Sequence, residues 1–239
     1  YMMELMARIA EATGHKEDLP EYIKYRDGCR ETYQAMMRTE KFSLDTDRQA
    51  QLVRPLAMGL LDKEQTAYAE KRLIKALDNY GWRLGTGFLS TPLILDVLTR
   101  IDTEAAYRLL ENEEIPGWLS MPKNGATTIW ESWEGDKAKG SGVASLDHYS
   151  KGAVCRWLFD TMCGIRPDGE NRFKITPHPG GHFTMAKAAY VSVCGRVESG
   201  WKKTGNGFKY TVTVPANCTA ELCLPDGRKA LLEAGTHTF

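Results

Sequence analysis

The stretch SLDHYSKGAVCRWLFDTMCGIRPDGEN, residues 145–171, decides the fold class, because the pattern of the chain changes within it. Its first part predicts a helix that begins at Ser145, a residue type that caps helices well, and ends at Gly164. The turn-forming run RPDGEN follows at once. The sequence therefore predicts helices before Gly164 and short strands after it, with the boundary near residues 164–170.

Upstream of this stretch, apolar residues recur at helical spacing, as in YMMELMARIAEATG at the start of the chain. The strongest signal is DKEQTAYAEKRLIKALDNYG, where Asp62 can cap the helix, Gln65 can complete a capping box and Gly81 can end it. Roughly seven helices are predicted, and short connections favour antiparallel hairpins. Their expected ranges are 1–14, 20–38, 46–61, 62–81, 90–101, 103–112 with Thr103 as the cap, and 145–164.

Downstream of Gly164, turn signals such as HPGG, TGNG and PDGR recur every 8 to 12 residues or so. Short runs of strand-forming residues lie between them. The clearest is FKYTVTV, which places Phe208, Tyr210, Val212 and Val214 on one side of a strand. This part of the chain predicts an antiparallel β-sandwich.

Composition narrows the function. The 239 residues include 31 basic and 31 acidic ones, so no basic excess exists to bind nucleic acid. No apolar run approaches the roughly 18 residues of a membrane helix, and no signal peptide is visible. The six cysteines form no CxxC pair and have no histidine cluster beside them, so we expect no metal, no cofactor and mostly buried thiols.

The start of the chain does not resemble a natural N-terminus. Tyr1 replaces the usual methionine and already belongs to a helical pattern. We therefore expect the chain to be part of a longer protein, whose targeting region is absent. A cytoplasmic and a periplasmic or secreted location both stay open.

The segment GATTIWESWEGD, residues 125–136, is the candidate functional segment. It holds Trp130 and Trp133 together with three acids, Glu131, Glu134 and Asp136, within a long connection that also contains Gly140 and Gly142. Loops this long in a compact domain are usually functional or disordered, and the tryptophans argue against disorder. A structural interpretation stays open, in which the tryptophans close the end of a helical bundle and the acids face water.

The chemistry of these side chains suits a sugar. An indole ring can stack on the C–H face of a sugar, and a carboxylate can act as acid, base or nucleophile at a glycosidic bond. Glu131 is the best placed carboxylate, because Trp130 precedes it and Trp133 lies two residues beyond. His148 follows on the first turn of the next predicted helix, where it could face the same cavity.

Four motifs carry a resemblance to a known family. GATTIWESW and SLDHYSKGAVCRWLF, together with LGTGFLSTPLILDVL upstream and VPANCTAELCLP downstream, resemble the bacterial α-L-rhamnosidases of glycoside hydrolase family 78. The resemblance covers nearly the whole chain. It implies a multidomain α plus β protein, with part of an (α/α)6 barrel of helix hairpins over residues 1–165 and a β-sandwich over residues 166–239.

The same resemblance implies an activity and its residues. It implies hydrolysis of terminal α-L-rhamnosyl residues with inversion, by two carboxylates and without a cofactor or metal. Glu131 takes the position of the general base, His148 that of a sugar contact, and Trp130 and Trp133 those of further substrate-binding residues. The expected substrates are rhamnosylated oligosaccharides, polysaccharides or plant glycosides.

Departures from the family pattern also matter. Ser132 stands where the family usually has arginine, and Asp147 where it has asparagine. The motif that carries the family's general acid is missing, and roughly seven helices make about half of a twelve-helix barrel. We therefore expect this chain to be the C-terminal part of a larger enzyme, with the missing N-terminal part as its partner.

Other function classes stay open on the sequence alone. The chain could be a non-catalytic carbohydrate-binding module, with Trp201 and Tyr210 of the sandwich as sugar contacts, or a degenerate glycosidase fragment. It could also be an (α/α)6 glycosidase or lyase that recognises another sugar.

Overall fold

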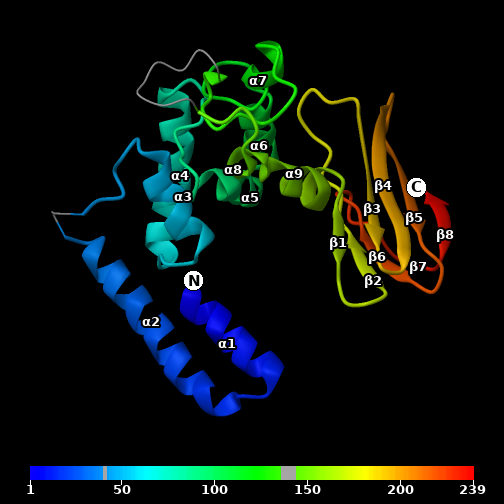
Figure 1. The fold of residues 1–239 in the computed structure, drawn as a ribbon. Coiled ribbons are helices and arrows are strands. Elements are labelled where there is room, and N and C mark those ends of the chain that lie inside the picture. The colour runs from blue at the N-terminus through cyan, green and yellow to red at the C-terminus, as the bar shows by residue number, and fades with distance from the viewer. Residues whose placement is uncertain (40–41, 136–143) are drawn as a thin grey trace. The chain divides into compact units, whose positions relative to one another are not determined.

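A computed structural model describes residues 1–39, 42–135 and 144–239 of the chain (Figure 1). Asp136, Gly140 and Gly142 lie outside the described residues. The chain forms two compact units, Tyr1–Val97 and Leu98–Phe239. The two units differ from the predicted domains, which divide the chain between residues 165 and 166 by secondary structure, helical before and β after. That boundary stays a prediction.

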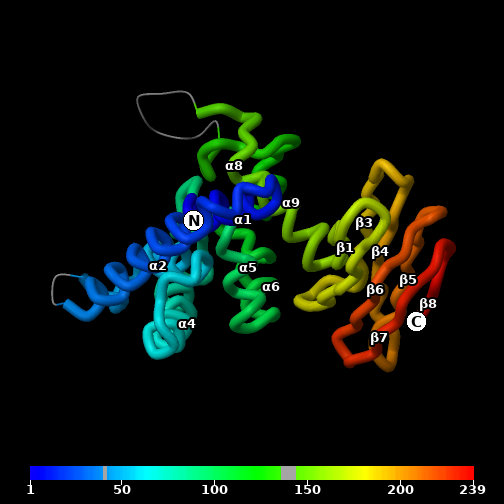
Figure 2. The backbone as a smooth tube through the Cα atoms, turned by 90° about the horizontal axis from the view of Figure 1, so that it is seen from below, coloured from blue at the N-terminus to red at the C-terminus, as the bar shows by residue number. Residues whose placement is uncertain are grey.

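Helix hairpins build the first unit. In the first hairpin α1 (Met2–Thr13) and α2 (Leu19–Met36) lie side by side, joined through a short 3-10 turn (Figure 1; Figure 2). In the second, α3 (Gln49–Ala57) packs against α4 (Lys63–Asn79). The next helix is α5 (Thr91–Ile101), within which the division between the two units falls.

Capping residues explain which helix ends could be predicted. The α4 capping box is present, with Gln65 N–H donating to Asp62 Oδ1 at 2.9 Å and Asp62 N–H donating to Gln65 Oε1 at 3.3 Å. Gly14 ends α1 in the left-handed conformation, at φ 84°. The predicted range of α3 was too long at both ends, and at its start Thr46 Oγ1 accepts the Arg48 N–H at 3.1 Å in a local turn that precedes the helix.

Two predicted helix caps are wrong. Asp102, rather than Thr103, caps α6 (Thr103–Leu110), since its carboxylate accepts the Glu104 N–H at 3.0 Å. The helix predicted from Ser145 begins later, at α8 (Tyr149–Gly152), with His148 as its cap. It is also interrupted at Ala153, directly after Gly152, and continues as α9 (Val154–Trp157) and a π-helical turn over Leu158–Met162. A further short helix, α7 (Ser120–Lys123), was not predicted.

The strands form two four-stranded sheets, as the sequence predicts for a sandwich (Figure 1; Figure 2). All pairs are antiparallel except β2–β6, which is parallel and was not predicted. One sheet has the order β1 (Ile165–Pro167), β2 (Arg172–Ile175), β6 (Thr219–Cys223), β7 (Lys229–Leu232). The other has the order β3 (Met185–Ser192), β4 (Gly195–Thr204), β5 (Gly207–Val214), β8 (Gly235–Thr238).

Alternation along β5 places its apolar side in the core. Tyr210, Val212 and Val214 are buried, as their spacing predicts. Trp201 of β4 is 2% exposed and Tyr210 is 4% exposed. The Trp201 indole N–H also donates to the Met162 carbonyl at 2.8 Å. The interpretation of Trp201 and Tyr210 as sugar contacts is therefore wrong, because neither ring has a face open to a ligand.

The cysteines are less buried than the sequence suggested. All six are free thiols, but only Cys163 and Cys218 are buried, while Cys29 and Cys155 are exposed. Among the described residues, no group of three or more His, Cys, Asp and Glu side chains is placed to hold a metal ion. No helix within the described residues is long and apolar enough to cross a membrane.

Candidate active site

Two chain segments, residues 128–131 and 145–148, meet in the second unit. Glu131 N–H donates to the Ser145 carbonyl at 2.8 Å, and His148 N–H donates to the Ile129 carbonyl at 2.7 Å. The Thr128 hydroxyl adds a bond to the Leu146 carbonyl. These bonds form a short ladder between segments that the sequence separates, and they bring the backbones of Glu131 and His148 together.

Within residues 1–39, 42–135 and 144–239, the Glu131 carboxylate accepts one hydrogen bond. Its Oε2 accepts the Ser145 N–H at 2.9 Å, and the side chain is partly exposed. No other group of the described residues bonds the second oxygen, Oε1. A carboxylate that is oriented through one oxygen keeps the other for a proton from water or a hydroxyl, as a general base requires.

The two tryptophans beside Glu131 are packed into the protein. Trp130 is 8% exposed and Trp133 is 9% exposed. Trp133 lies edge to face with Trp118, with ring centroids 6.2 Å apart. The backbone of Gly135 lies so close to Trp130 that an added Cβ would stand 2.3 Å from a ring carbon. Both indoles therefore support the shape of the segment, and little of either ring is accessible to a ligand.

His148 has a structural task as well. Its ring Nδ1 accepts the Ser150 N–H at 3.3 Å, which caps α8, and it lies 3.0 Å from the Ser150 hydroxyl. The ring stacks on Tyr149 with centroids 5.1 Å apart. Because Nδ1 accepts a bond, the neutral ring carries its proton on Nε2.

Sequence reasoning missed Lys151. This residue is 5% exposed, and its ammonium donates to the backbone carbonyl of Glu131. The ammonium also lies 4.3 Å from the centroid of the Trp133 ring. Burial lowers the pKa of Lys151, while the charges of Glu134 and Glu131 oppose that shift. In the sequence Lys151 lies in a predicted helix, where a lysine normally faces water, so only the fold could identify it.

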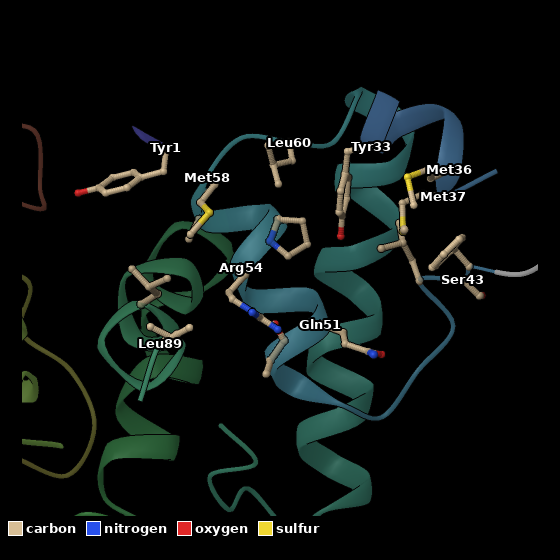
Figure 3. Close-up of a pocket in the computed structure, with 16 residues that line it drawn as sticks. Tyr1, Tyr33, Met36, Met37, Ser43, Gln51, Arg54, Met58, Leu60 and Leu89 are labelled. Carbon is tan, nitrogen blue, oxygen red and sulfur yellow. The ribbon is translucent and has the colours of Figure 1, made fainter. Parts of the chain in front are cut away.

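A separate pocket of about 870 Å3 lies in the first unit, between the end of α2 and α3. Figure 3 shows Tyr33 and Met36 from α2, with Gln51 and Arg54 from α3, on its walls. Among residues 1–39 and 42–97, the side chains that line this pocket are mostly apolar and include no aspartate or glutamate.

Family models match both architectures. Residues 1–162 match the model described as the bacterial alpha-L-rhamnosidase 6 hairpin glycosidase domain. The chain belongs to this family. Residues 164–239 match the bacterial alpha-L-rhamnosidase C-terminal domain, so the rhamnosidase match extends through the sandwich. The resemblance expected from the four sequence motifs is confirmed.

Curated relatives of this rhamnosidase-family chain are much longer. An alpha-L-rhamnosidase of Streptomyces avermitilis is 34% identical over 229 residues, which are 93% of this chain and 22% of the relative. One of Formosa agariphila is 32% identical over 99% of this chain and 26% of the relative. The chain thus spans about a quarter of the length of the curated relatives it matches.

Solved rhamnosidase structures share the fold. The alpha-L-rhamnosidase of Aspergillus terreus matches with a TM-score of 0.91 and 27% identity, over 99% of this chain and 29% of that one. The Streptomyces avermitilis enzyme, solved in complex with L-rhamnose, matches with a TM-score of 0.86 and 31% identity, over 99% of this chain and 25% of that one. The predicted order, helix hairpins of a partial barrel followed by a β-sandwich, is confirmed for this rhamnosidase-family chain.

Proposed function

We propose that this chain is the C-terminal part of an α-L-rhamnosidase, an enzyme that hydrolyses terminal α-L-rhamnosyl groups of oligosaccharides, polysaccharides or plant glycosides. The observation that carries the proposal is the Glu131 carboxylate. It lies in a segment of the family-matched domain, oriented by the Ser145 N–H and partly exposed. Glu131 acts as the general base that removes a proton from the attacking water.

The proposed reaction inverts the anomeric centre. In an inverting glycosidase a second carboxyl group protonates the leaving oxygen, about 6.5 to 9.5 Å from the base, so that a water fits between base and sugar. We place this general acid in the portion of the enzyme that precedes the chain. That placement agrees with a chain spanning 22% and 26% of two relatives. The missing N-terminal part is then a required partner.

The neighbours of Glu131 take supporting roles in this proposal. His148 contacts the sugar, from a segment bonded to that of the base. Trp130 and Trp133 pack on either side of Glu131 in the chain and offer the substrate the small part of each ring that is accessible. Residues 1–165 supply the barrel portion and residues 166–239 the sandwich.

The test compares two glutamates of one segment in the full-length protein. Glu131→Gln keeps the shape of the side chain but removes the base, so hydrolysis of an aryl α-L-rhamnoside is expected to fall by a factor of about 100 to 10,000. Glu134→Gln is the matched control, because Glu134 is exposed three residues away, and it should keep wild-type turnover. NMR of the first product should show the β-anomer of L-rhamnose.

Three results would contradict the proposal. Wild-type turnover by Glu131→Gln would exclude Glu131 as the base. A first product with the α-anomer would exclude inversion. L-rhamnose binding without turnover by the wild-type full-length protein would indicate a degenerate enzyme instead.

A further inference from the structure

Lys151 is unusual because its charge is buried. Lysine is among the residues that proteins almost never bury completely unless the charge is paired. Lys151 is 5% exposed, yet the hydrogen bond of its ammonium goes to a backbone carbonyl, that of Glu131. A charge kept at this position costs desolvation energy, so its placement beside the proposed base calls for a reason.

The contacts of Lys151 converge on the segment of Glu131. Its ammonium lies over the Trp133 ring, 4.3 Å from the centroid, in a cation–π arrangement. Its own carbonyl accepts the indole N–H of Trp118 at 3.0 Å, and Trp118 packs against Trp133. Lys151 thus connects the backbone of Glu131 to the indoles of Trp133 and Trp118.

The bond to the carbonyl completes the restraint of Glu131. The N–H of Glu131 is bonded to the Ser145 carbonyl, and its C=O is bonded to Lys151. When both backbone groups of a residue are hydrogen-bonded, its φ and ψ are restrained, and so is the direction in which its side chain leaves the backbone. The Ser145 N–H then sets the position of the carboxylate itself.

From this geometry we infer that Lys151 is a positioning residue, whose ammonium holds the backbone and the indole around Glu131 so that the carboxylate points at the attacking water. This inference rests on the proposed function, because it assigns Lys151 a task in the same reaction. Lys151 acts through Glu131 and does not exchange a proton with the substrate.

The energetics separate this role from a structural one. Replacing a buried charge by an apolar side chain of similar volume is often neutral or stabilising. Methionine resembles lysine in length and has no charge. Lys151→Met should therefore keep the fold and its melting temperature while it releases the Glu131 carbonyl. A catalytic group misplaced by about 1 Å can lose on the order of 100-fold in rate.

The experiment measures kcat, KM and melting temperature for four variants of the full-length protein, with an aryl α-L-rhamnoside as substrate. Lys151→Met is expected to lose about 10- to 100-fold in kcat with little change in KM or melting temperature. Lys151→Arg, which keeps charge and donors, should recover part of kcat. Lys123→Met is the matched control, since Lys123 is an exposed lysine of α7 paired with Glu113 at 2.9 Å. Glu131→Gln supplies the reference for loss of the base.

The outcomes separate the two proposals. If Glu131→Gln is inactive but Lys151→Met keeps wild-type kcat, the inference is wrong and the proposed function stands. If Lys151→Met fails to fold, or loses melting temperature and kcat together without recovery by Lys151→Arg, Lys151 is structural and the inference is again wrong. If the wild-type protein hydrolyses no α-L-rhamnoside, the proposed function fails and the inference falls with it.

Discussion

At Gly135 the backbone turns back against the Trp130 indole. Its φ is +60°, a value that residues with a side chain rarely adopt, and the ring leaves no room for a Cβ. Gly125, at the other end of the segment, has φ +86° but nothing within 4 Å of an added Cβ. A side chain at either position would strain the backbone, but only at Gly135 would it also collide with another side chain.

We expect Gly135→Ala to be more destabilising than Gly125→Ala. Both changes place alanine in the left-handed region, at a cost of roughly 1–2 kcal/mol. Gly135→Ala also forces the Trp130 ring to move, which should lower the free energy of unfolding by about 1–3 kcal/mol more. Urea unfolding followed by circular dichroism measures the difference. Equal losses of unfolding free energy in the two variants would show that the Trp130 ring can move aside without destabilising the protein.

The sequence could single out candidate residues of the site but not how they are held. Glu131 and His148 were singled out because their motifs are local. The bonds that hold Glu131 come from Ser145 and Lys151, which are 14 and 20 residues away. Trp118 is farther still from Lys151 in the chain, at 33 residues. Such contacts follow from the packing of loops, for which the sequence carries no periodic signal.

Among the elements, the start of α4 shows how one carboxylate stabilises a helix. The Gln65 N–H and, after it, the Arg38 guanidinium lower the pKa of Asp62 below its usual value. A carboxylate with a lowered pKa stabilises the folded state above the pKa of the unfolded chain, about 3.9 for aspartate. That contribution is lost as the pH falls through the lower pKa of the folded state.

Asp62→Asn should therefore show a stability loss that depends on pH. Asparagine is also a good cap, so the variant keeps the hydrogen bond to Gln65 and loses only the charge. At pH 7 the denaturation midpoint of the variant should lie below that of the wild type. The gap should narrow below about pH 4 and close where Asp62 is protonated in the folded state. Glu64→Gln, which removes another acidic side chain from the first turn of α4, is the control. A difference in midpoint between Asp62→Asn and the wild type that stays constant with pH would contradict this account.

Helices with local end signals were predictable, and those without them were not. The Asp62 capping box and Gly14 act through neighbours in the chain, so the ends they set could be read from the sequence. The interruption at Ala153 and the π-helical turn are marked by no capping side chain, so the sequence predicted neither. In the same way, alternation revealed the buried side of β5, but the parallel pairing of β6 with β2 joins strands far apart in the chain.

At the scale of the whole molecule, the first hairpin is notable for the apolar side chains that it exposes. Met2, Ile9 and Tyr25 are all exposed, and α2 buries none of its residues despite its length. An exposed apolar surface on one hairpin indicates a surface made to be covered. The proposed N-terminal part of the enzyme would cover it.

We expect the 239-residue chain to bind the dye ANS and the full-length protein to bind less of it per molecule. The dye reports exposed apolar surface, so its fluorescence should fall when the hairpin is covered. Polar replacements, Ile9→Gln and Tyr25→Gln, should reduce the signal of the short chain alone. If the short chain leaves the dye fluorescence unchanged, its apolar side chains form no continuous surface, and the idea of a covered hairpin is wrong.

The parallel β2–β6 pair has a consequence for the order of folding. β2 ends at Ile175 and pairs on one edge with β1, but its neighbour on the other edge, β6, begins only at Thr219, after β3, β4 and β5 have been made. Pairing strands so distant in the chain is slow, because a long loop must close first. During synthesis one edge of β2 therefore stays unpaired until β6 has been made, and such an edge can pair with another nascent chain. A ribosome that stalls, or a protease that cuts, between Val214 and Thr219 would leave that edge open, so the last strands act as the sandwich's protection against aggregation.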